Sequence, residues 1–314
     1  MKPSSIPGDL KLNSSQADLF QGWLRNGQCP KGTIPIIRRS QEDHEYARSI
    51  HLNQRRMQLN HSFVDSVPNH EYAAVSLDGN FYGAHASINV WKPVVYKNEE
   101  MSLAQIWVVS GPDNLLNSME AGWKVDSGDQ NTRFFIYWTS DGYQKTGCYN
   151  LDCSGFVQTN PKFALGSPIQ AVSSYMSKQE DIEITIYKNS GNWWLKVQDE
   201  EVGYWPQSIF TYLANNATEI TWGGEIYNSK PGGHHTSTQM GSGHFANEGY
   251  GKASYFRNIQ YMDISGKFID AEGEGLAPSV TNPSCYDLAV QNNNNDGYGT
   301  NFYFGGPGYS QKCP

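Results

Sequence analysis

The sequence predicts a mainly β protein: an antiparallel β-sandwich of two stacked sheets, preceded by a small N-terminal segment with short helices. Aromatic residues make up 13% of the 314 residues and glycine occupies 31 positions. This mixture favours sheets joined by turns over helical bundles. From about Tyr72 onward, apolar residues alternate with polar ones at a period of two. The connections are of hairpin length, whereas a parallel sheet needs crossover helices.

The N-terminal segment differs from the rest of the chain. "SSQADLFQGWLRNG" predicts an amphipathic helix capped at Ser14 or Ser15, and a second, polar helix begins near Ser40. Residues 1–62 carry nine Lys or Arg against five Asp or Glu, while residues 63–314 carry 14 against 26. A basic leader, residues 1–65, therefore precedes an acidic β domain, residues 66–314.

Strand candidates follow one another through the β domain, separated by Gly, Asn, Asp and Pro turns. A glycine-rich and asparagine-rich loop near the end of the chain precedes one aromatic tail strand. The clearest candidates are residues 84–91, 103–110, 118–125, 133–140, 181–188, 192–199, 219–227 and 253–263.

Composition and charge exclude several classes of function. The net charge is −8 and no stripe of Lys or Arg is present, so nucleic acid is not an expected partner. An acidic domain also avoids anionic membranes, and no apolar run approaches the roughly 18 residues of a transmembrane helix. "MKPSSIPGDLKLN" lacks the apolar centre of a signal peptide, so a signal peptide is absent from this chain.

Cysteines and glycosylation sequons nevertheless favour a secreted protein, in the extracellular space, cell wall or vacuole. Cys148 with Cys153, and Cys285 with Cys313, are expected disulfides, which leaves Cys29 unpaired. A cytoplasmic protein with free thiols is the alternative. Three sequons are candidate glycosylation sites, at Asn13, Asn60 and Asn216.

Two glutamates stand alone in otherwise apolar strands. In residues 118–125, alternation turns Glu120 away from the apolar face, and in residues 219–227 it does the same for Glu225. Each has a glycine two positions away on its own face, Gly122 and Gly223, and glycine in a strand often marks close approach of a ligand or another backbone. The alternative is two exposed glutamates on a solvated face.

Two neighbouring carboxyl groups can divide acid and base chemistry, because one raises the pKa of the other. Such a pair suits hydrolysis of a peptide or a glycoside. We take Glu120 and Glu225 as the candidate catalytic residues. Residues near them in the strands or the following loop are candidate substrate-binding residues: Gly122, Trp123, Trp222, Gly223, Tyr227 and Gln239.

Rival sites are weaker. His234, His235 and His244 match no zinc spacing, and Ser242 lacks the G-x-S-x-G context of a serine nucleophile. No glycine loop that cradles phosphate opens a helix. We expect no metal and no cofactor.

Several motifs together resemble the neprosin-type plant glutamic peptidases. The motifs are "NSMEAGWKV", "RFFIYWTSDGYQKTGCYNLDCSGFVQ", "WGGEIYNS" and "GYGKASYFRNIQ", and "CPKGTIPIIRR" resembles the activation peptide. The resemblance implies a secreted zymogen with a β-sandwich peptidase domain, cutting on the carboxyl side of proline at acid pH. It places the catalytic pair on Glu120 and Glu225, and implies the same two disulfides.

The leading hypothesis is therefore an acid endopeptidase acting on proline-containing peptides or proteins, with its own pro-segment as intramolecular inhibitor. Arg38, Arg39, Arg55 and Arg56 are expected to hold the basic leader over an acidic cleft until carboxylates protonate near pH 4. A folded N-terminal subdomain without inhibitory function is the alternative for the leader. A glycoside hydrolase, and a non-catalytic sandwich that binds glycans or cell wall, are the alternatives for the whole protein.

Overall fold

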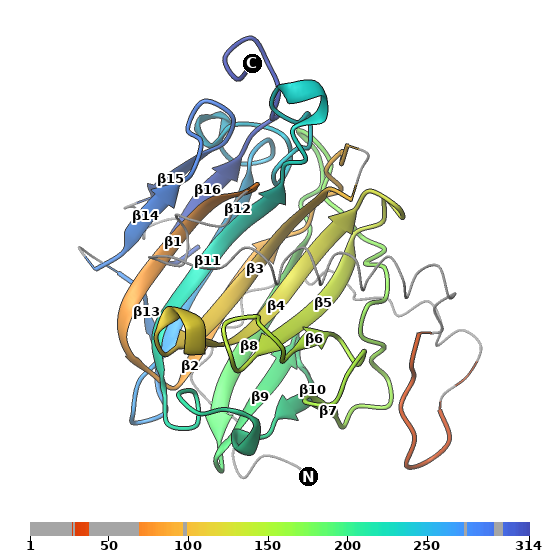
Figure 1. Cartoon of the computed structure of the whole chain (residues 1–314), viewed down its shortest axis with the longest axis vertical. Helices are drawn as coiled ribbons and strands as arrows, with labels where there is room; N and C mark the ends of the chain where they lie inside the picture. The colour runs from red at the N-terminus through yellow and green to blue at the C-terminus, as the bar shows by residue number, and fades with distance from the viewer. Residues whose placement is uncertain (1–26, 28, 38–68, 97–98, 273–274, 292–297) are drawn as a thin grey trace.

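The computed structural model describes residues 27, 29–37, 69–96, 99–272, 275–291 and 298–314. The two predicted leader helices and the four arginines named with them lie outside these residues. The described chain is mainly β, as predicted (Figure 1). Its helical elements are four short 3-10 turns: η2 Asp113–Leu115, η3 Gln207–Ile209, η4 Pro231–Gly233 and η5 Ala246–Glu248. Within these ranges no helix has the length and apolar character needed to cross a membrane.

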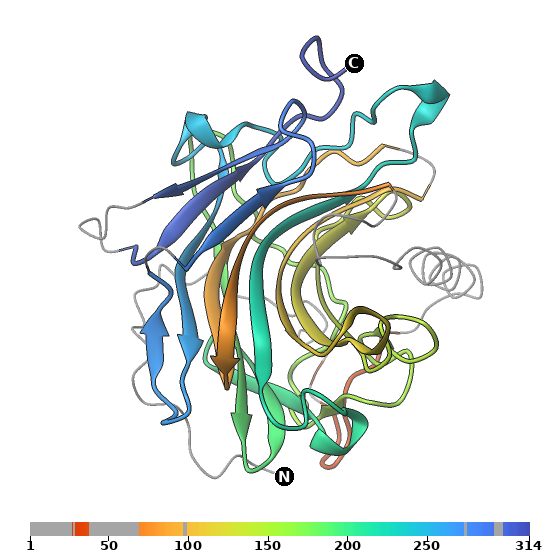
Figure 2. The same ribbon diagram turned by 60° about the vertical axis from the view of Figure 1, so that its left-hand side comes forward.

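Two antiparallel sheets are stacked against each other (Figures 1 and 2). The first has the strand order β14-β1-β11-β3-β4-β5-β6, with β1 His70–Phe81, β3 Met101–Ser110, β4 Asn117–Asp126, β5 Arg133–Thr139, β6 Cys148–Tyr149, β11 Ala217–Tyr227 and β14 Ala277–Val280. The second has the order β15-β16-β12-β2-β8-β9-β10-β7, with β13 paired to β12. Its strands are β2 Gly83–Asn89, β7 Val157–Gln158, β8 Asp181–Asn189, β9 Asn192–Val197, β10 Glu200–Trp205, β12 Ser254–Met262, β13 Phe268–Asp270, β15 Asp287–Gln291 and β16 Asn301–Gly305.

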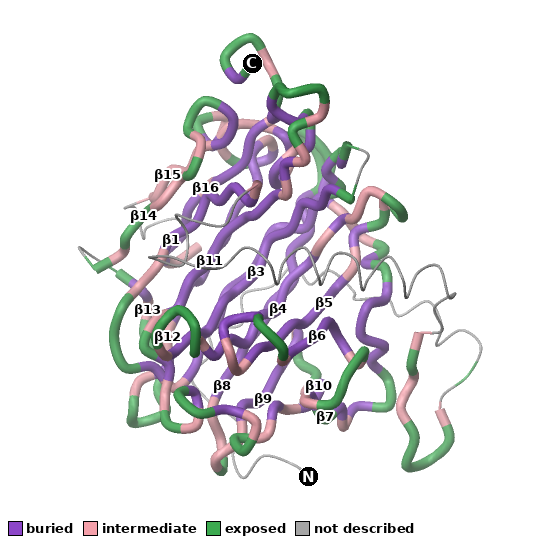
Figure 3. Tube along the Cα trace, viewed as in Figure 1, coloured by how far each residue is buried: buried purple, intermediate pink, exposed green. Residues whose placement is uncertain are grey.

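The main hydrophobic core lies between the sheets, because alternate residues of each strand point inward. Ala104, Ile106 and Val108 of β3 are fully buried there, together with Trp123 of β4 and Trp222 of β11. Buried positions run along the whole length of the central strands (Figure 3). Each predicted strand is present to within a few residues at its ends.

The first sheet also buries part of its outer face. Its strands bow in Figure 2, and the outer face lies on the hollow side of the bend. The residues of β3 that alternate with the core positions belong to a second apolar cluster on this face, which we call the outer-face cluster. It consists of Tyr72, Met101, Leu103, Trp107, Val109, Phe135, Tyr137, Tyr143 and Tyr149, with Leu116 and Tyr227 packed against it.

Both predicted disulfides are present. Cys148 and Cys153 close a tight turn after β5, and Cys285 and Cys313 fasten the end of the chain to the segment that precedes β15. Within the described residues, Cys29 has no disulfide partner. Of the three sequon asparagines, Asn216 is described: it precedes β11 and donates to Asn80 Oδ1 and Ala217 O. Asn13 and Asn60 lie outside the described residues.

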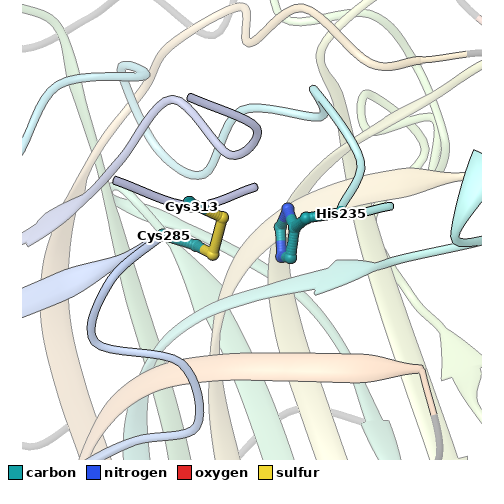
Figure 4. A group of neighbouring side chains, drawn as sticks. All are labelled: His235, Cys285 and Cys313. Carbon is teal, nitrogen blue, oxygen red and sulfur yellow. A yellow bond between two sulfur atoms is a disulfide. The ribbon is translucent and has the colours of Figure 1, made fainter. Parts of the chain in front are cut away.

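His235 lies beside the Cys285–Cys313 disulfide (Figure 4). The three side chains are close enough to suggest metal ligands, but the two sulfur atoms are bonded to each other and are not thiolates. The imidazole has partners of its own, with Nδ1 2.7 Å from Thr236 O and Nε2 3.0 Å from the carboxylate oxygens of Glu71. This group therefore works as a structural clamp on the loop after β11.

Candidate active site

The register of three central strands brings Glu120 and Glu225 onto one face. On β3, Trp107 pairs with Glu120 of β4, and Leu103 pairs with Glu225 of β11. Since Leu103 and Trp107 both belong to the outer-face cluster, the two glutamates lie on the outer face of the first sheet. The face that alternation predicts for each of them is the face that the structure shows.

A row of two glycines and one glutamine forms the floor between the rows that hold the two glutamates. Gln105 is paired with Gly122 on one side and with Gly223 on the other, so the three residues form one row across the sheet. A Cβ at Gly122 would lie 2.0 Å from Ala104 O and 2.6 Å from Gln105 Cβ. A Cβ at Gly223 would lie 2.5 Å from Ala73 O. The close approach that these glycines permit is thus that of the neighbouring strands, and it leaves a low floor beside each carboxyl group.

Glu120 accepts three hydrogen bonds from neutral side chains. The Ser118 hydroxyl donates to Oε1 over 2.8 Å, and the Tyr143 hydroxyl donates to the same oxygen over 2.5 Å. Gln105 Nε2 donates to Oε2 over 3.0 Å. Glu120 is only 6% exposed. These contacts fix the orientation of the carboxyl group without placing a charge beside it.

Glu225 has a different partner, an imidazole. His70 Nδ1 lies 2.5 Å from Glu225 Oε1, and both side chains are buried. The His70 ring stands edge-on to the ring of Tyr227, with centroids 5.1 Å apart. Tyr72 of β1 is paired directly with Glu225 across the β1–β11 ladder. Glu225 is therefore enclosed by β1 and by a residue of its own strand.

Electrostatic coupling shows that the two carboxyl groups act on each other. Burial raises the pKa of Glu120 from 4.5 to about 7; its hydrogen bonds work against this rise, and the charge of Glu225 adds to it. Burial also raises the pKa of the Tyr72 phenol well above its usual range, and the charges of Glu225 and Glu120 both contribute. The charges of both carboxylates thus raise the pKa of one phenol. At mildly acid pH, Glu120 carries a proton.

Apolar and aromatic side chains surround the pair. The outer-face cluster supplies Tyr72 and Leu103 beside Glu225, and Trp107 and Tyr137 beside Glu120. Such surroundings lower the local dielectric constant and strengthen each electrostatic interaction at the carboxyl groups. The arrangement is suited to acid–base hydrolysis of a bond held along the sheet face.

The candidate substrate-binding residues separate into two groups. Gly122 and Gly223 form the floor, and Tyr227 packs against His70. Trp123 and Trp222 do not belong to this face: both are fully buried in the core between the sheets. Their indole N–H groups donate to backbone oxygens of β2, over 2.9 Å and 3.3 Å. Sequence proximity to the glutamates was misleading here, because adjacent strand residues point to opposite faces.

Gln239 lies in the long loop after β11 and binds another loop. Its Oε1 accepts from Val94 N over 2.9 Å, and its backbone N–H donates to Val94 O over the same distance. These two bonds clamp the segment after β2 to the loop. Gln239 therefore holds a loop in place, and the contacts above give it no part in the arrangement around Glu120 and Glu225.

Sequence reasoning did not identify His70, Tyr143, Ser118 or Gln105. Gln105 and Ser118 lie on the same strand faces as the glutamates, so the alternation that found the glutamates also contained them. His70 belongs to β1, a strand that the sequence analysis did not predict. Tyr143 lies in a turn and has a left-handed backbone with φ of 61°. No sequence period places a turn residue over a strand.

A β-sandwich with two buried, coupled carboxyl groups on one sheet face has the chemistry of an acid–base hydrolase. The family model described as Neprosin matches residues 98–307, more than half of the chain, and the chain therefore belongs to the neprosin family. Membership of this family supports a peptidase, a hydrolase of peptide bonds.

Solved structures similar to this chain include two peptidases. The scytalido-glutamic peptidase with a transition state analog inhibitor is 11% identical, with 76% of this chain and 98% of that chain covered and a TM-score of 0.43. SCP-B, a member of the Eqolisin family, in complex with the tripeptide Ala-Ile-His, is 9% identical, with the same coverage and a TM-score of 0.40. A glycoside hydrolase family 16 endo-glucanase from Bacteroides ovatus is 11% identical, with 52% of this chain and 69% of that chain covered and a TM-score of 0.32.

Proposed function

We propose that this protein is a glutamic endopeptidase in which Glu120 and Glu225 are the catalytic pair. One observation carries the proposal: Glu120, with a pKa of about 7, is coupled to Glu225 on a single sheet face in a chain of the neprosin family. A carboxyl group kept neutral beside a second carboxyl group is the arrangement that separates acid from base.

The two glutamates take different parts in this proposal. Glu120 is protonated at mildly acid pH and donates a hydrogen bond to the oxygen of the scissile carbonyl. Glu225 is the base and accepts a proton from the attacking water. Gln105, which lies between the two rows, orients Glu120 through the bond from its side-chain amide.

Hydrolysis then proceeds through a tetrahedral intermediate without a covalent bond to the enzyme. Water oxygen attacks the carbonyl carbon while one water proton moves to Glu225, and the proton of Glu120 moves to the carbonyl oxygen. Collapse of the intermediate breaks the C–N bond. The proton on Glu225 passes to the leaving nitrogen, and the hydroxyl proton returns to Glu120, so the enzyme regains its starting protonation.

The finer features of the activity are also proposals. Cleavage on the carboxyl side of proline is supported by the motif resemblance, and an acid working range by the raised pKa of Glu120. Secretion is supported by two disulfides, which persist mainly in oxidising compartments. The zymogen, with residues 1–65 as inhibitor, is supported by the opposite charge of the leader and the body.

The test compares substrates before and after acid treatment. The protein is held at pH 7 and at about pH 4, its mass is followed, and each sample is offered a proline-rich peptide and a panel of polysaccharides. We expect loss of roughly 60 residues and peptide cleavage after proline only in the acid sample. Cleavage of a polysaccharide with no cleavage of the peptide would favour a glycoside hydrolase and contradict the proposal. Full peptidase activity of the uncut chain at pH 7 would contradict the zymogen alone.

A further inference from the structure

His70, the first residue of β1, lies within hydrogen-bonding distance of Glu225. Its Nδ1 lies 2.5 Å from Glu225 Oε1, and its side chain is 4% exposed. An ionised carboxylate can only accept hydrogen bonds, so when Glu225 is the base, the proton of this bond belongs to His70 Nδ1. The imidazole is then the donor, whether it is neutral or carries a charge.

Contacts of the two residues next to His70 in the chain, Asn69 and Glu71, hold it in place. Asn69, just before it, has a left-handed backbone with φ of 71°, and its carbonyl accepts from Asn228 N over 2.7 Å. Glu71, just after it, points to the other face, where it binds His235 and accepts from Asn228 Nδ2 over 2.9 Å. The start of β1 is thus held to the end of β11 on both sides of His70. Such anchoring is expected where a side chain must keep one orientation.

We infer that His70 is a positioning residue for Glu225, one that holds the carboxylate toward the substrate face. This inference rests on the proposed function, since it needs Glu225 to be the base. A carboxylate that must accept a proton in one direction needs a partner that keeps one orientation. His70 would therefore act on kcat, through the orientation of Glu225, and not on substrate binding.

Other groups facing Glu225 are held differently. The Tyr72 phenol from β1 also bonds to Glu225, and Tyr227 from β11 contacts the ring of His70. Gln105 from the intervening strand β3 donates to Glu120 instead. His70 is therefore the partner of Glu225 that the anchored start of β1 holds in place.

The experiment measures kcat and KM separately for a proline-containing peptide in His70→Asn and His70→Ala. Asparagine keeps a neutral donor close to the position of Nδ1, and alanine keeps none. We expect kcat of His70→Ala to fall roughly 10²-fold, because a misplaced base loses its alignment with the attacking water. His70→Asn should recover much of this loss, with KM close to that of the wild type in both variants.

His85→Asn is the matched control. His85 is also a buried strand histidine, but its Nδ1 lies 2.9 Å from a hydroxyl, Thr185 Oγ1, on the second sheet. The kcat of His85→Asn should equal that of the wild type. An unchanged kcat in His70→Ala would overturn the inference, as would a loss in His70→Ala that His70→Asn does not relieve. Loss of activity in Glu225→Gln together with an unchanged kcat in the His70 variants would reject this inference and leave the catalytic pair intact.

Discussion

Glu120 and Glu225 are the same amino acid on the same sheet face, yet their surroundings differ. Glu120 accepts bonds from a serine, a tyrosine and a glutamine. Glu225 has a histidine, and the Tyr72 phenol also bonds to it. The donors at Glu120 are neutral, and burial outweighs them, so the pKa of that carboxyl group rises to about 7. The imidazole is thus the partner that distinguishes Glu225 from Glu120.

Under the proposed function, this difference indicates how one fold obtains an acid and a base from two identical side chains. Hydrogen bonds to Glu120 set its orientation but do not offset its desolvation, so it holds a proton at mildly acid pH. At Glu225 an imidazole nitrogen lies within hydrogen-bonding distance, the partner that we propose orients the base. The proposed division between acid and base therefore follows from the partners that the neighbouring strands contribute.

The largest expected effect comes from replacing each glutamate by glutamine. Glu225→Gln removes the base, and we expect kcat/KM to fall by about 10⁴-fold. Glu120→Gln keeps an N–H group that can donate to the carbonyl oxygen, so we expect a smaller fall, about 10²-fold. Kinetics on the acid-treated variants with a proline-containing peptide measure both. Equal activity of either variant and the wild type would remove that residue from the catalytic pair.

Glu120→Gln, which should lower activity, should raise the free energy of unfolding at alkaline pH. Because the pKa of Glu120 is raised in the folded state, its contribution to stability is fully present below about pH 4.5 and is lost as the pH rises through about 7. Each pH unit of this displacement corresponds to about 1.4 kcal/mol, so Glu120→Gln should stabilise the protein by ~3 kcal/mol at pH 8 relative to the effect at pH 4.

Urea unfolding at the two pH values checks this. Glu200→Gln is the control, since Glu200 is exposed and its Oε2 accepts from Asn160 Nδ2, an acceptor that glutamine retains. The control should shift stability by less than about 0.5 kcal/mol at either pH. An effect of Glu120→Gln that does not vary with pH would mean that Glu120 is ionised throughout.

The fold was predictable because alternation is a local signal. Eight strand candidates were found from period two alone, and each is a strand of the structure. The analysis of alternation does not predict strand β1, although β1 lies between β14 and β11 in the first sheet. The C-terminal half of β1, "SLDGNF", contains a polar, turn-like stretch with Asp78 and Gly79. The register of β1 with β11 shifts in this stretch. Such a stretch reads as a loop until its partner strand is known.

The candidate site was predictable only in part, for a similar reason. Alternation predicts the sheet face on which Glu120 and Glu225 lie, because the face of a side chain depends only on its position within its own strand. Their partners depend on which strands are neighbours: His70 reaches Glu225 across the β1–β11 ladder, and Tyr143 reaches Glu120 from a turn after β5. Trp123 and Trp222 are near the glutamates in sequence, but alternation turns their side chains to the core face. Nearness in sequence therefore does not place them beside the carboxyl groups.

The smallest expected effect is a shift of about one pH unit in the basic limb of the activity profile. Its measurement is the most direct test of Glu120 as the acid and Glu225 as the base. Burial raises the pKa of Glu120, whereas the bond from Tyr143 lowers it, so Tyr143→Phe should raise it further. Tyr187→Phe, which removes a tyrosine–carboxylate bond to Glu201 elsewhere in the protein, is the control. The measurement is the pH dependence of kcat/KM for the wild type and both variants. The wild type and Tyr187→Phe should lose activity above about pH 7, and Tyr143→Phe about one pH unit higher. Wild-type activity that continues to rise above pH 8, or a basic limb that Tyr143→Phe leaves in place, would contradict the assignment of Glu120 as the acid.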